Sequence, residues 1–257
     1  SPVLAGEKTI DNIMLNDEAW YRQNNITFYK GERAIRIDRN KRRVMTTGNR
    51  EIPYDRLVLA TGSVPVRIPV PGHDLKNVLT FRHINDVNTM LELSGRKQHA
   101  AVIGGGLLGL EAANGLRKQG MKVTVVHAFD SLLNRQLDKT AARLLQQSLE
   151  EKGIEFVMGA MTAAIEGNEQ GEVERLQFKD GTHLDVDMVV MATGVKPNIE
   201  LAKNSGLQCD RGILVNDVLQ TFDPAIYAVG ECIQHRGQLF GLVAPTYEQA
   251  RVCANHL

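Results

Sequence analysis

The chain has 257 residues, enough for one or two domains with a sizeable core. It carries 30 basic and 30 acidic residues, and this balance argues against nucleic acid or an anionic membrane surface as a partner. No apolar run reaches the about 18 residues of a membrane-spanning helix, and no secretory signal peptide is visible. The scattered Cys209, Cys232 and Cys253 predict neither a redox disulfide nor a metal site, and they favour a cytoplasmic location.

The first part of the chain, residues 1–80, predicts a short helix followed by strands. We expect the helix around Asn16–Gln23, and short strands at Ile26–Tyr29, Ala34–Ile37 and Arg43–Thr46. The basic run Arg39–Arg43 is interpreted as the solvated turn of a hairpin. The continuous apolar run Arg56–Ala60 is typical of a strand in a sheet covered on both faces, and it ends in Thr61 and Gly62.

A glycine motif dominates the central part, residues 81–212. The apolar strand Ala100–Ile103 runs into Gly104, Gly106 and Gly109, which have the spacing of a dinucleotide-binding fingerprint. The first glycine permits a tight turn, the second lets a pyrophosphate approach the backbone, and the third lets the helix pack on the strand. The helix N-terminus would then meet the phosphates. The alternative is a glycine-rich turn that only packs.

The rest of the central part predicts further helices and strands around this motif. Helices are expected at His83–Leu93 and from the glycine motif to about Lys118. A third is expected at Lys139–Lys152, with Asp138 as its cap. Strands are expected at Lys122–Val126, Ile154–Met158, Ala163–Glu166, Glu172–Phe178, Thr182–Val186 and Asp187–Ala192.

Two strands end in the same sequence, Ala-Thr-Gly, at residues 60–62 and 192–194. The carboxyl end of a strand in a doubly wound sheet is where ligands bind, and small residues there let a cofactor approach the backbone. A plain strand-to-loop exit is the alternative. The two copies on either side of the glycine motif favour a function in binding.

The last part, residues 213–257, predicts strands at Gly212–Val215 and Ile226–Val229 and a helix around Pro245–His256. The second strand delivers Gly230 and Glu231. An acid placed directly after a glycine at a strand end can bond sugar-like hydroxyls, although a solvated acid is the alternative.

The residue at the end of the strand after the glycine motif bears on coenzyme choice. NAD-binding folds place an acid there, whereas NADP-binding folds place an arginine nearby. This chain has His127, which we expect to contact the cofactor, followed by Asp130 and Arg135. Because no basic cluster follows directly, the sequence favours NADH. A solvated imidazole at a strand end is the alternative for His127.

Together these motifs resemble a known family. The two Ala-Thr-Gly endings, GGGLLGLE at 104–111 and TFDPAIYAVGE at 221–231 are similar to the pyridine nucleotide–disulfide oxidoreductase superfamily, flavoproteins with two dinucleotide-binding domains. Within it, SPVLAGEK at 1–8, NRQLD at 134–138, GEC at 230–232 and FGLVAP at 240–245 most resemble the flavin module of NADH-dependent nitrite reductase large subunits.

The resemblance implies an α/β fold with two Rossmann-like, glutathione-reductase-type domains and a β-meander. Residues 1–80 and 213–257 would form the FAD domain, and residues 81–212 the NAD(P)H domain. The FAD domain lacks its first βαβ unit, which on the family pattern precedes Ser1. The resemblance therefore implies weakened FAD binding by this segment, and inactivity of the segment alone stays an open alternative.

The resemblance also implies the site residues. Those facing NAD(P)H would be Gly104, Gly106 and Gly109 at the pyrophosphate, the catalytic acid Glu111 near the nicotinamide, and Gly194 beside the same cofactor. Those facing FAD would be Thr61 and Gly62 at a strand end, with Gly230 and Glu231 at the ribityl chain and phosphate. No metal ligand is implied.

The function implied is hydride transfer from NADH to FAD and then electron delivery to an acceptor, the iron–sulfur and siroheme part of an assimilatory-type nitrite reductase. Two alternatives stay open. One is a reductase for a small redox protein, such as a rubredoxin or ferredoxin. The other is a fragment that binds NAD(H) without turnover. The sequence leaves the oligomeric state open.

Overall fold

The computed structural model describes all 257 residues, which divide into two compact units. The first unit comprises Ser1–Leu15 and Pro65–Gly194, and the second comprises Asn16–Val64 and Val195–Leu257. These divisions differ from the expected boundaries at 80/81 and 212/213. The reason is that a strand within residues 65–80 joins the sheet of the first unit, whereas residues 195–212 pack into the core of the second.

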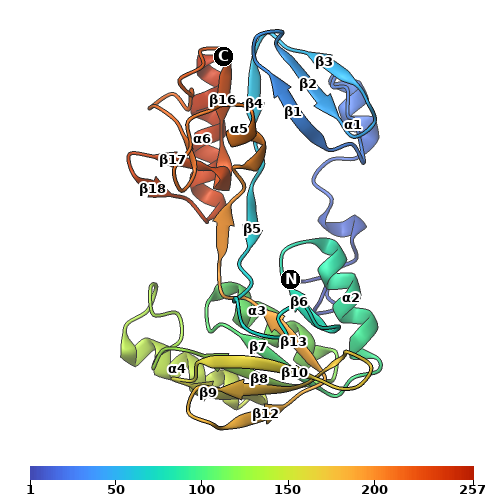
Figure 1. Cartoon of the computed structure of the whole chain (residues 1–257), viewed down its shortest axis with the longest axis vertical. Helices are drawn as coiled ribbons and strands as arrows, with labels where there is room; N and C mark the ends of the chain where they lie inside the picture. Colours follow the sequence, from blue (N-terminus) through green and yellow to red (C-terminus); the bar gives the residue numbers. More distant parts are fainter. The chain divides into compact units, whose positions relative to one another are not determined.

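The first unit is built on a five-stranded parallel sheet of order β6-β13-β7-β8-β9 (Figure 1). Its strands are β6 (Val78–Thr80), β7 (His99–Ile103), β8 (Lys122–His127), β9 (Ile154–Met158) and β13 (Met188–Met191). A second, antiparallel sheet contains β10 (Thr162–Gly167), β11 (Val173–Phe178) and β12 (His183–Asp185). The helices are η1 (Asp11–Ile13), α2 (Ile84–Ser94), α3 (Leu107–Lys118) and α4 (Lys139–Glu150).

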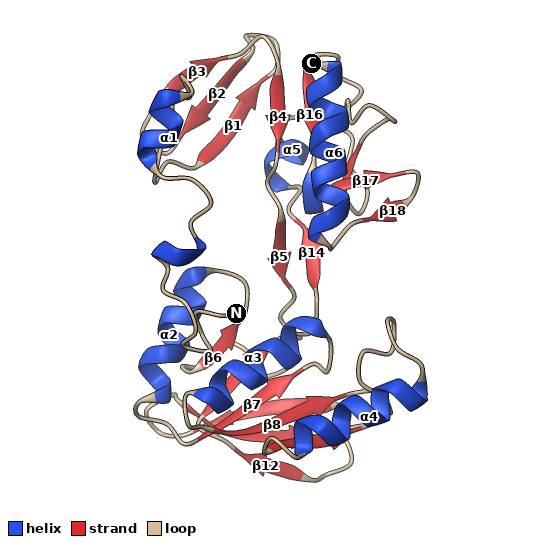
Figure 2. Cartoon of the chain, turned by 180° about the vertical axis from the view of Figure 1, so that it is seen from behind, coloured by secondary structure: helices blue, strands red, loops and turns tan.

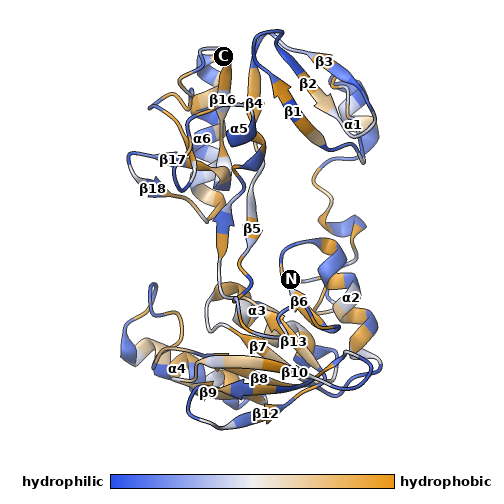
Figure 3. Ribbon diagram, in the orientation of Figure 1, coloured by the Kyte–Doolittle hydropathy of each residue, from blue (hydrophilic) through white to orange (hydrophobic).

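Alternation along the strands gives the parallel sheet two apolar faces. Ala100 and Val102 of β7 belong to a core cluster that includes residues of α2 and α3, whereas Ala101 and Ile103 belong to a cluster that includes β11. Successive side chains of a strand point to opposite faces, so a strand covered on both sides must be apolar throughout. Figure 2 shows α3 and α4 over one face of the sheet, and Figure 3 shows the hydrophobic colouring of its strands.

The second unit contains shorter elements. Its helices are α1 (Glu18–Gln23), α5 (Glu200–Asn204), η2 (Gly230–Cys232) and α6 (Val243–His256). Its strands are β1 (Ala34–Asp38), β2 (Arg43–Thr46), β3 (Glu51–Pro53), β4 (Leu57–Leu59), β14 (Val195–Pro197), β15 (Ile213–Leu214), β16 (Ile226–Ala228), β17 (Ile233–His235) and β18 (Gln238–Leu239), with β5 (Ser63–Pro65) at the boundary. The strands β4 and β16 run parallel, so their carboxyl ends lie at the same edge.

Most expected elements are confirmed, but two expectations for the second unit are wrong. Ile26–Tyr29 forms no strand, because Ile26 bonds back to Tyr21 in a turn and the ring of Phe28 stacks on Tyr21 at 4.7 Å. The apolar strand at Leu57–Leu59 is not buried on both faces, since Val58 is 39% exposed and β4 pairs only with β16. None of the helices combines the length and apolar character needed to cross a bilayer.

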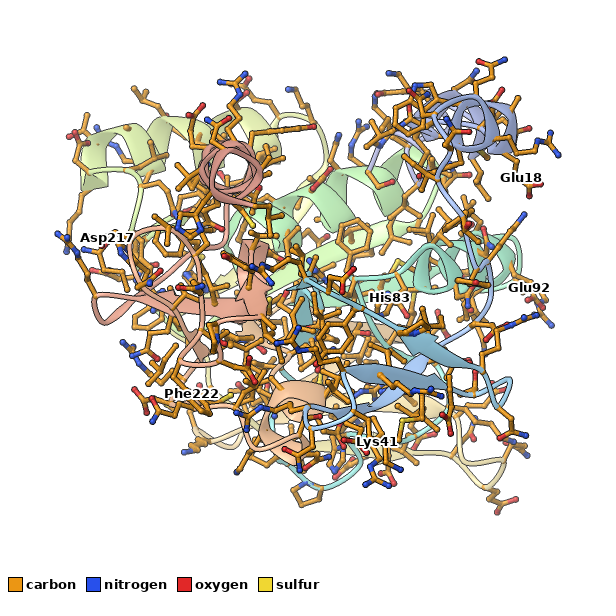
Figure 4. All side chains as sticks on the ribbon, turned by 90° about the horizontal axis from the view of Figure 1, so that it is seen from above. Glu18, Lys41, His83, Glu92, Asp217 and Phe222 are labelled. Atoms are coloured by element: carbon orange, nitrogen blue, oxygen red, sulfur yellow. The ribbon has the colours of Figure 1, made fainter.

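An ion pair ties the β1–β2 turn to the loop before β16. The Nε of Arg39 donates to Asp223 at 2.8 Å, and both side chains are partly exposed, 27% and 15%. The guanidinium also lies 4.6 Å from the ring centre of Phe222, which is labelled in Figure 4. The backbone N–H of Ala225 donates to the same carboxylate. Burial by itself would raise the pKa of Asp223, but these bonds from Arg39 and Ala225 hold that pKa below its ordinary value.

Because the pKa of Asp223 is depressed in the folded chain, its stabilising contribution is present above about pH 4 and is lost as the pH falls through the folded value. We expect Asp223→Asn to lower the free energy of unfolding by about 1–3 kcal/mol at pH 7, and by much less at pH 3. Urea unfolding of the full chain at both pH values measures this difference, with Asp55→Asn, at an exposed position, as the control. An unchanged free energy of unfolding at pH 7 would contradict it.

Candidate functional site

A cavity of about 480 Å³ lies in the first unit where β7, β8 and β13 end. Parallel neighbouring strands bring their carboxyl ends to one edge, the usual ligand position in a doubly wound sheet. The lining includes the glycine loop after β7, the end of β8 and the Ala-Thr-Gly that follows β13. Of the sequence-predicted residues, it contains Gly104, Gly106, His127 and Gly194.

The three motif glycines differ in what surrounds them. Gly104 has φ +122°, and a Cβ there would lie 2.4 Å from the carbonyl oxygen of Ala192. A Cβ on Gly109 would lie 1.9 Å from the carbonyl oxygen of Gly104, so the start of α3 packs directly on the loop. Gly106 has an ordinary φ of −88°, and a Cβ there would meet no atom within 4 Å. Nothing in the chain itself requires glycine at Gly106, which fits a position reserved for a ligand.

The Ala-Thr-Gly after β13 also lines this cavity, next to the glycine loop. Gly194 has φ +123° and accepts a hydrogen bond from Val66 N–H at 2.9 Å. The hydroxyl of Thr193 donates to the Val66 carbonyl, also at 2.9 Å. These two bonds fix the turn and leave the bare backbone of Gly194 on the cavity.

His127 is not the solvated imidazole that the sequence allowed. It is the last residue of β8, only 7% exposed, and its Nδ1 accepts the N–H of Gly105 at 3.0 Å. The edge of the ring packs against Phe129, with 5.4 Å between ring centres. Burial lowers the pKa of His127 below its ordinary value, so the imidazole is neutral near pH 7.

Sequence reasoning named Arg135 beside the question of coenzyme choice but did not expect it at the cavity. It is the one charged residue of the cavity lining, which contains no carboxylate. Asp130, the nearest acid after β8 in the sequence, does not line the cavity and pairs with Lys139 at 2.7 Å. Arg135 belongs to the stretch NRQLD at 134–138, but nothing in that sequence indicates that the arginine borders a cavity.

Glu111 lies on α3 but does not line this cavity. Its side chain is 49% exposed, and its Oε1 lies 2.6 Å from the amino nitrogen of Ser1. A role near a nicotinamide therefore stays a prediction from resemblance.

A second cavity, of about 400 Å³, lies in the second unit where β4 and β16 end. It brings together Gly62, Gly230 and Glu231, as well as the start of α6. Both glycines have positive φ, +65° and +87°, so their turns present bare backbone. Thr61 does not line this cavity; its hydroxyl donates to the Asn198 carbonyl at 2.6 Å and fixes the loop after β4.

Polar groups at this second cavity are already oriented. The carboxylate of Glu231 accepts from the Ser63 hydroxyl at 2.9 Å. The side chain of Gln249, from α6, accepts the Gly230 N–H at 2.7 Å, while its Nε2 is buried and has no hydrogen-bond partner. The bond between Gly230 and Gln249 therefore holds the turn after β16 against α6.

Comparison with known proteins identifies the family of the chain. The family model described as pyridine nucleotide-disulphide oxidoreductase matches residues 1–256. In Bacillus subtilis (strain 168), a nitrite reductase (NAD(P)H) is 52% identical and an assimilatory nitrate reductase electron transfer subunit is 49% identical, both over all 257 residues. The chain spans about a third of the length of each, 32% and 33% respectively.

A solved structure confirms the α/β architecture. The covalent putidaredoxin reductase–putidaredoxin complex superposes with a TM-score of 0.91 at 31% identity, covering 99% of this chain and 63% of that chain. The resemblance that the motifs predicted is thus confirmed at the level of the family.

Proposed function

Since the chain belongs to the pyridine nucleotide-disulphide oxidoreductase family, we propose that it is an FAD-dependent module that accepts hydride from NAD(P)H and passes electrons on. The observation that carries this proposal is the repeated strand ending. One Ala-Thr-Gly borders the cavity with the glycine loop, and the other borders the cavity with Gly230 and Glu231.

In the first cavity the chain's own residues would bind and orient the coenzyme. The bare backbone of Gly106 and the N-terminus of α3 suit a pyrophosphate, because free N–H groups and the helix dipole both favour negative charge. Gly194 would lie beside the same coenzyme, and we keep Glu111 as the proposed acid near the nicotinamide.

In the second cavity, Gly62 and Gly230 would lie against FAD, and Glu231 would accept hydrogen bonds from ribityl hydroxyls. Thr61 would act by holding the loop in place through Asn198. A bound flavin would supply the exchange between two-electron and one-electron chemistry, which no side chain of the chain offers.

For the acceptor, we propose the iron–sulfur and siroheme part of an assimilatory-type nitrite reductase. Support comes from the nitrite reductase that is 52% identical and about three times as long. A small redox protein is the second candidate, favoured by the similarity to a reductase captured with putidaredoxin. A cytoplasmic location remains a prediction from the scattered free cysteines.

A visible absorption spectrum of the purified chain, before and after anaerobic NADH, tests the proposal. We expect flavin absorption that bleaches on reduction. A chain that takes up no flavin even after FAD is added would contradict the proposal and support the alternative, a fragment that binds NAD(H) without turnover. Addition of candidate acceptors to the reduced chain would then separate the two acceptor classes.

The preferred coenzyme can be tested separately. We propose NADH, as the sequence favours, but Arg135 and the lack of a lining carboxylate favour NADPH as a second candidate. Arginine binds phosphate through charge-assisted bonds, so we expect Arg135→Ala to weaken NADPH binding about tenfold and to change NADH binding by less than about threefold. Calorimetric titration with each coenzyme measures these affinities. Equal losses of affinity for NADH and NADPH would contradict a role of Arg135 in binding the additional phosphate of NADPH.

A further inference from the structure

We propose that His127 is a positioning residue of the coenzyme site: its Nδ1 holds the glycine loop through Gly105, and the ring itself makes no polar contact with the coenzyme. The inference rests on the proposed function in one respect, namely that the first cavity binds a nicotinamide dinucleotide. It changes the role of His127 from the cofactor contact expected from the sequence to a support behind the loop.

The contact between His127 and Gly105 is both polar and steric. The Gly105 N–H donates to Nδ1 at 3.0 Å within the buried interior. A Cβ on Gly105 would lie 2.9 Å from the Cγ and Cδ2 atoms of the ring, and 2.7 Å from Leu132. The imidazole therefore packs directly against the backbone of Gly105, which explains why the middle residue of the Gly-Gly-Gly run is also glycine.

The hydrogen bond fixes the tautomer of the ring. Nδ1 can accept only when it carries no proton, so the neutral ring carries its proton on Nε2. That Nε2 atom is buried, so its N–H does not reach the cavity surface. Both ring nitrogens are thus withdrawn from the cavity surface, and the ring has no polar atom available to a ligand in this conformation.

The end of β8 and the loop after it hold the glycine loop at three points. Gly104 N–H donates to the Val126 carbonyl at 2.8 Å, His127 takes the N–H of Gly105, and the Gly105 carbonyl accepts from Leu133 N–H at 3.0 Å. Only one of these bonds uses a side chain. The bond from Gly105 to His127 is therefore the one of the three that a change of side chain can remove.

Two substitutions separate positioning from direct contact. Asparagine can place its Oδ1 close to the position of Nδ1, whereas leucine has similar volume and no acceptor. We expect His127→Leu to leave a buried N–H without a partner and to weaken NADH binding about tenfold or more. His127→Asn should restore binding to within about threefold of the parent chain. The control is His183→Asn at an exposed position of β12.

Two measurements on the full chain test this. Calorimetric titration with NADH gives the affinities, and amide hydrogen exchange at Gly105 reports the hydrogen bond without any coenzyme. We expect exchange at Gly105 to accelerate at least about tenfold in His127→Leu and to stay slow in His127→Asn. Unchanged exchange in His127→Leu would overturn the inference.

An asparagine variant that keeps slow exchange but binds NADH as weakly as the leucine variant would also overturn it, because the ring would then contact the coenzyme directly. A parent chain that binds no NADH would instead count against the proposed function. The exchange measurement would still decide whether His127 holds the loop.

Discussion

Replacing Gly109 by alanine is expected to destabilise the first unit strongly and to abolish coenzyme binding with it. The added Cβ would lie 1.9 Å from the carbonyl oxygen of Gly104 and 2.9 Å from its carbon, and both are backbone atoms within the glycine loop. Relief would require α3 to move away from β7. We expect a loss of about 2–4 kcal/mol in the free energy of unfolding, although alanine normally favours a helix interior.

Urea unfolding of the full chain, with NADH titration of the variant, measures both effects. Gly95→Ala is the matched control, because it makes the same substitution at the end of a helix, α2, where the backbone has an ordinary φ of −73°. Its Cβ would make only a normal contact at 3.7 Å, with the carbonyl oxygen of Glu92. Equal losses from the two substitutions would contradict the claim that α3 packs on the loop at Gly109.

Gly106→Ser is expected to have the reverse effect, with stability retained and coenzyme affinity lost. The φ and ψ of Gly106 suit any residue, its Cβ would meet nothing, and it is the N-cap of α3, where serine is favourable. The free energy of unfolding should change by less than about 0.5 kcal/mol. Because the new side chain occupies the space reserved for the pyrophosphate, NADH affinity should fall at least about tenfold.

The same titration applied to Gly95→Ser provides the control. Gly95 ends α2 with an ordinary φ of −73°, and its added Cβ would make only a normal contact at 3.7 Å. Unimpaired NADH binding in Gly106→Ser would mean that the cavity wall at this glycine does not face the coenzyme, and the proposed site would have to move.

The sequence by itself predicted where the strands that border the first cavity end. The run from Ala100 through Gly109 predicted strand, loop and helix, because apolar β-forming residues followed by regularly spaced glycines leave few other conformations. The strand before Thr193 and Gly194 was equally legible, since all four residues of β13 are buried and apolar. Local pattern and burial agree at these places, so local reasoning was sufficient.

Tertiary structure decided everything that depends on pairing distant segments. Gly62 and Glu231 border one cavity only because β4 and β16 pair in parallel, a contact that no local pattern encodes. Tertiary structure likewise decided that each unit is built from two separate stretches of the chain. It also decided that Arg135 lines a cavity and that His127 is buried. The partner of a side chain depends on which groups the fold brings against it. His127 accepts from Gly105 because the backbone N–H of Gly105 is buried beside the ring, and a buried N–H requires an acceptor.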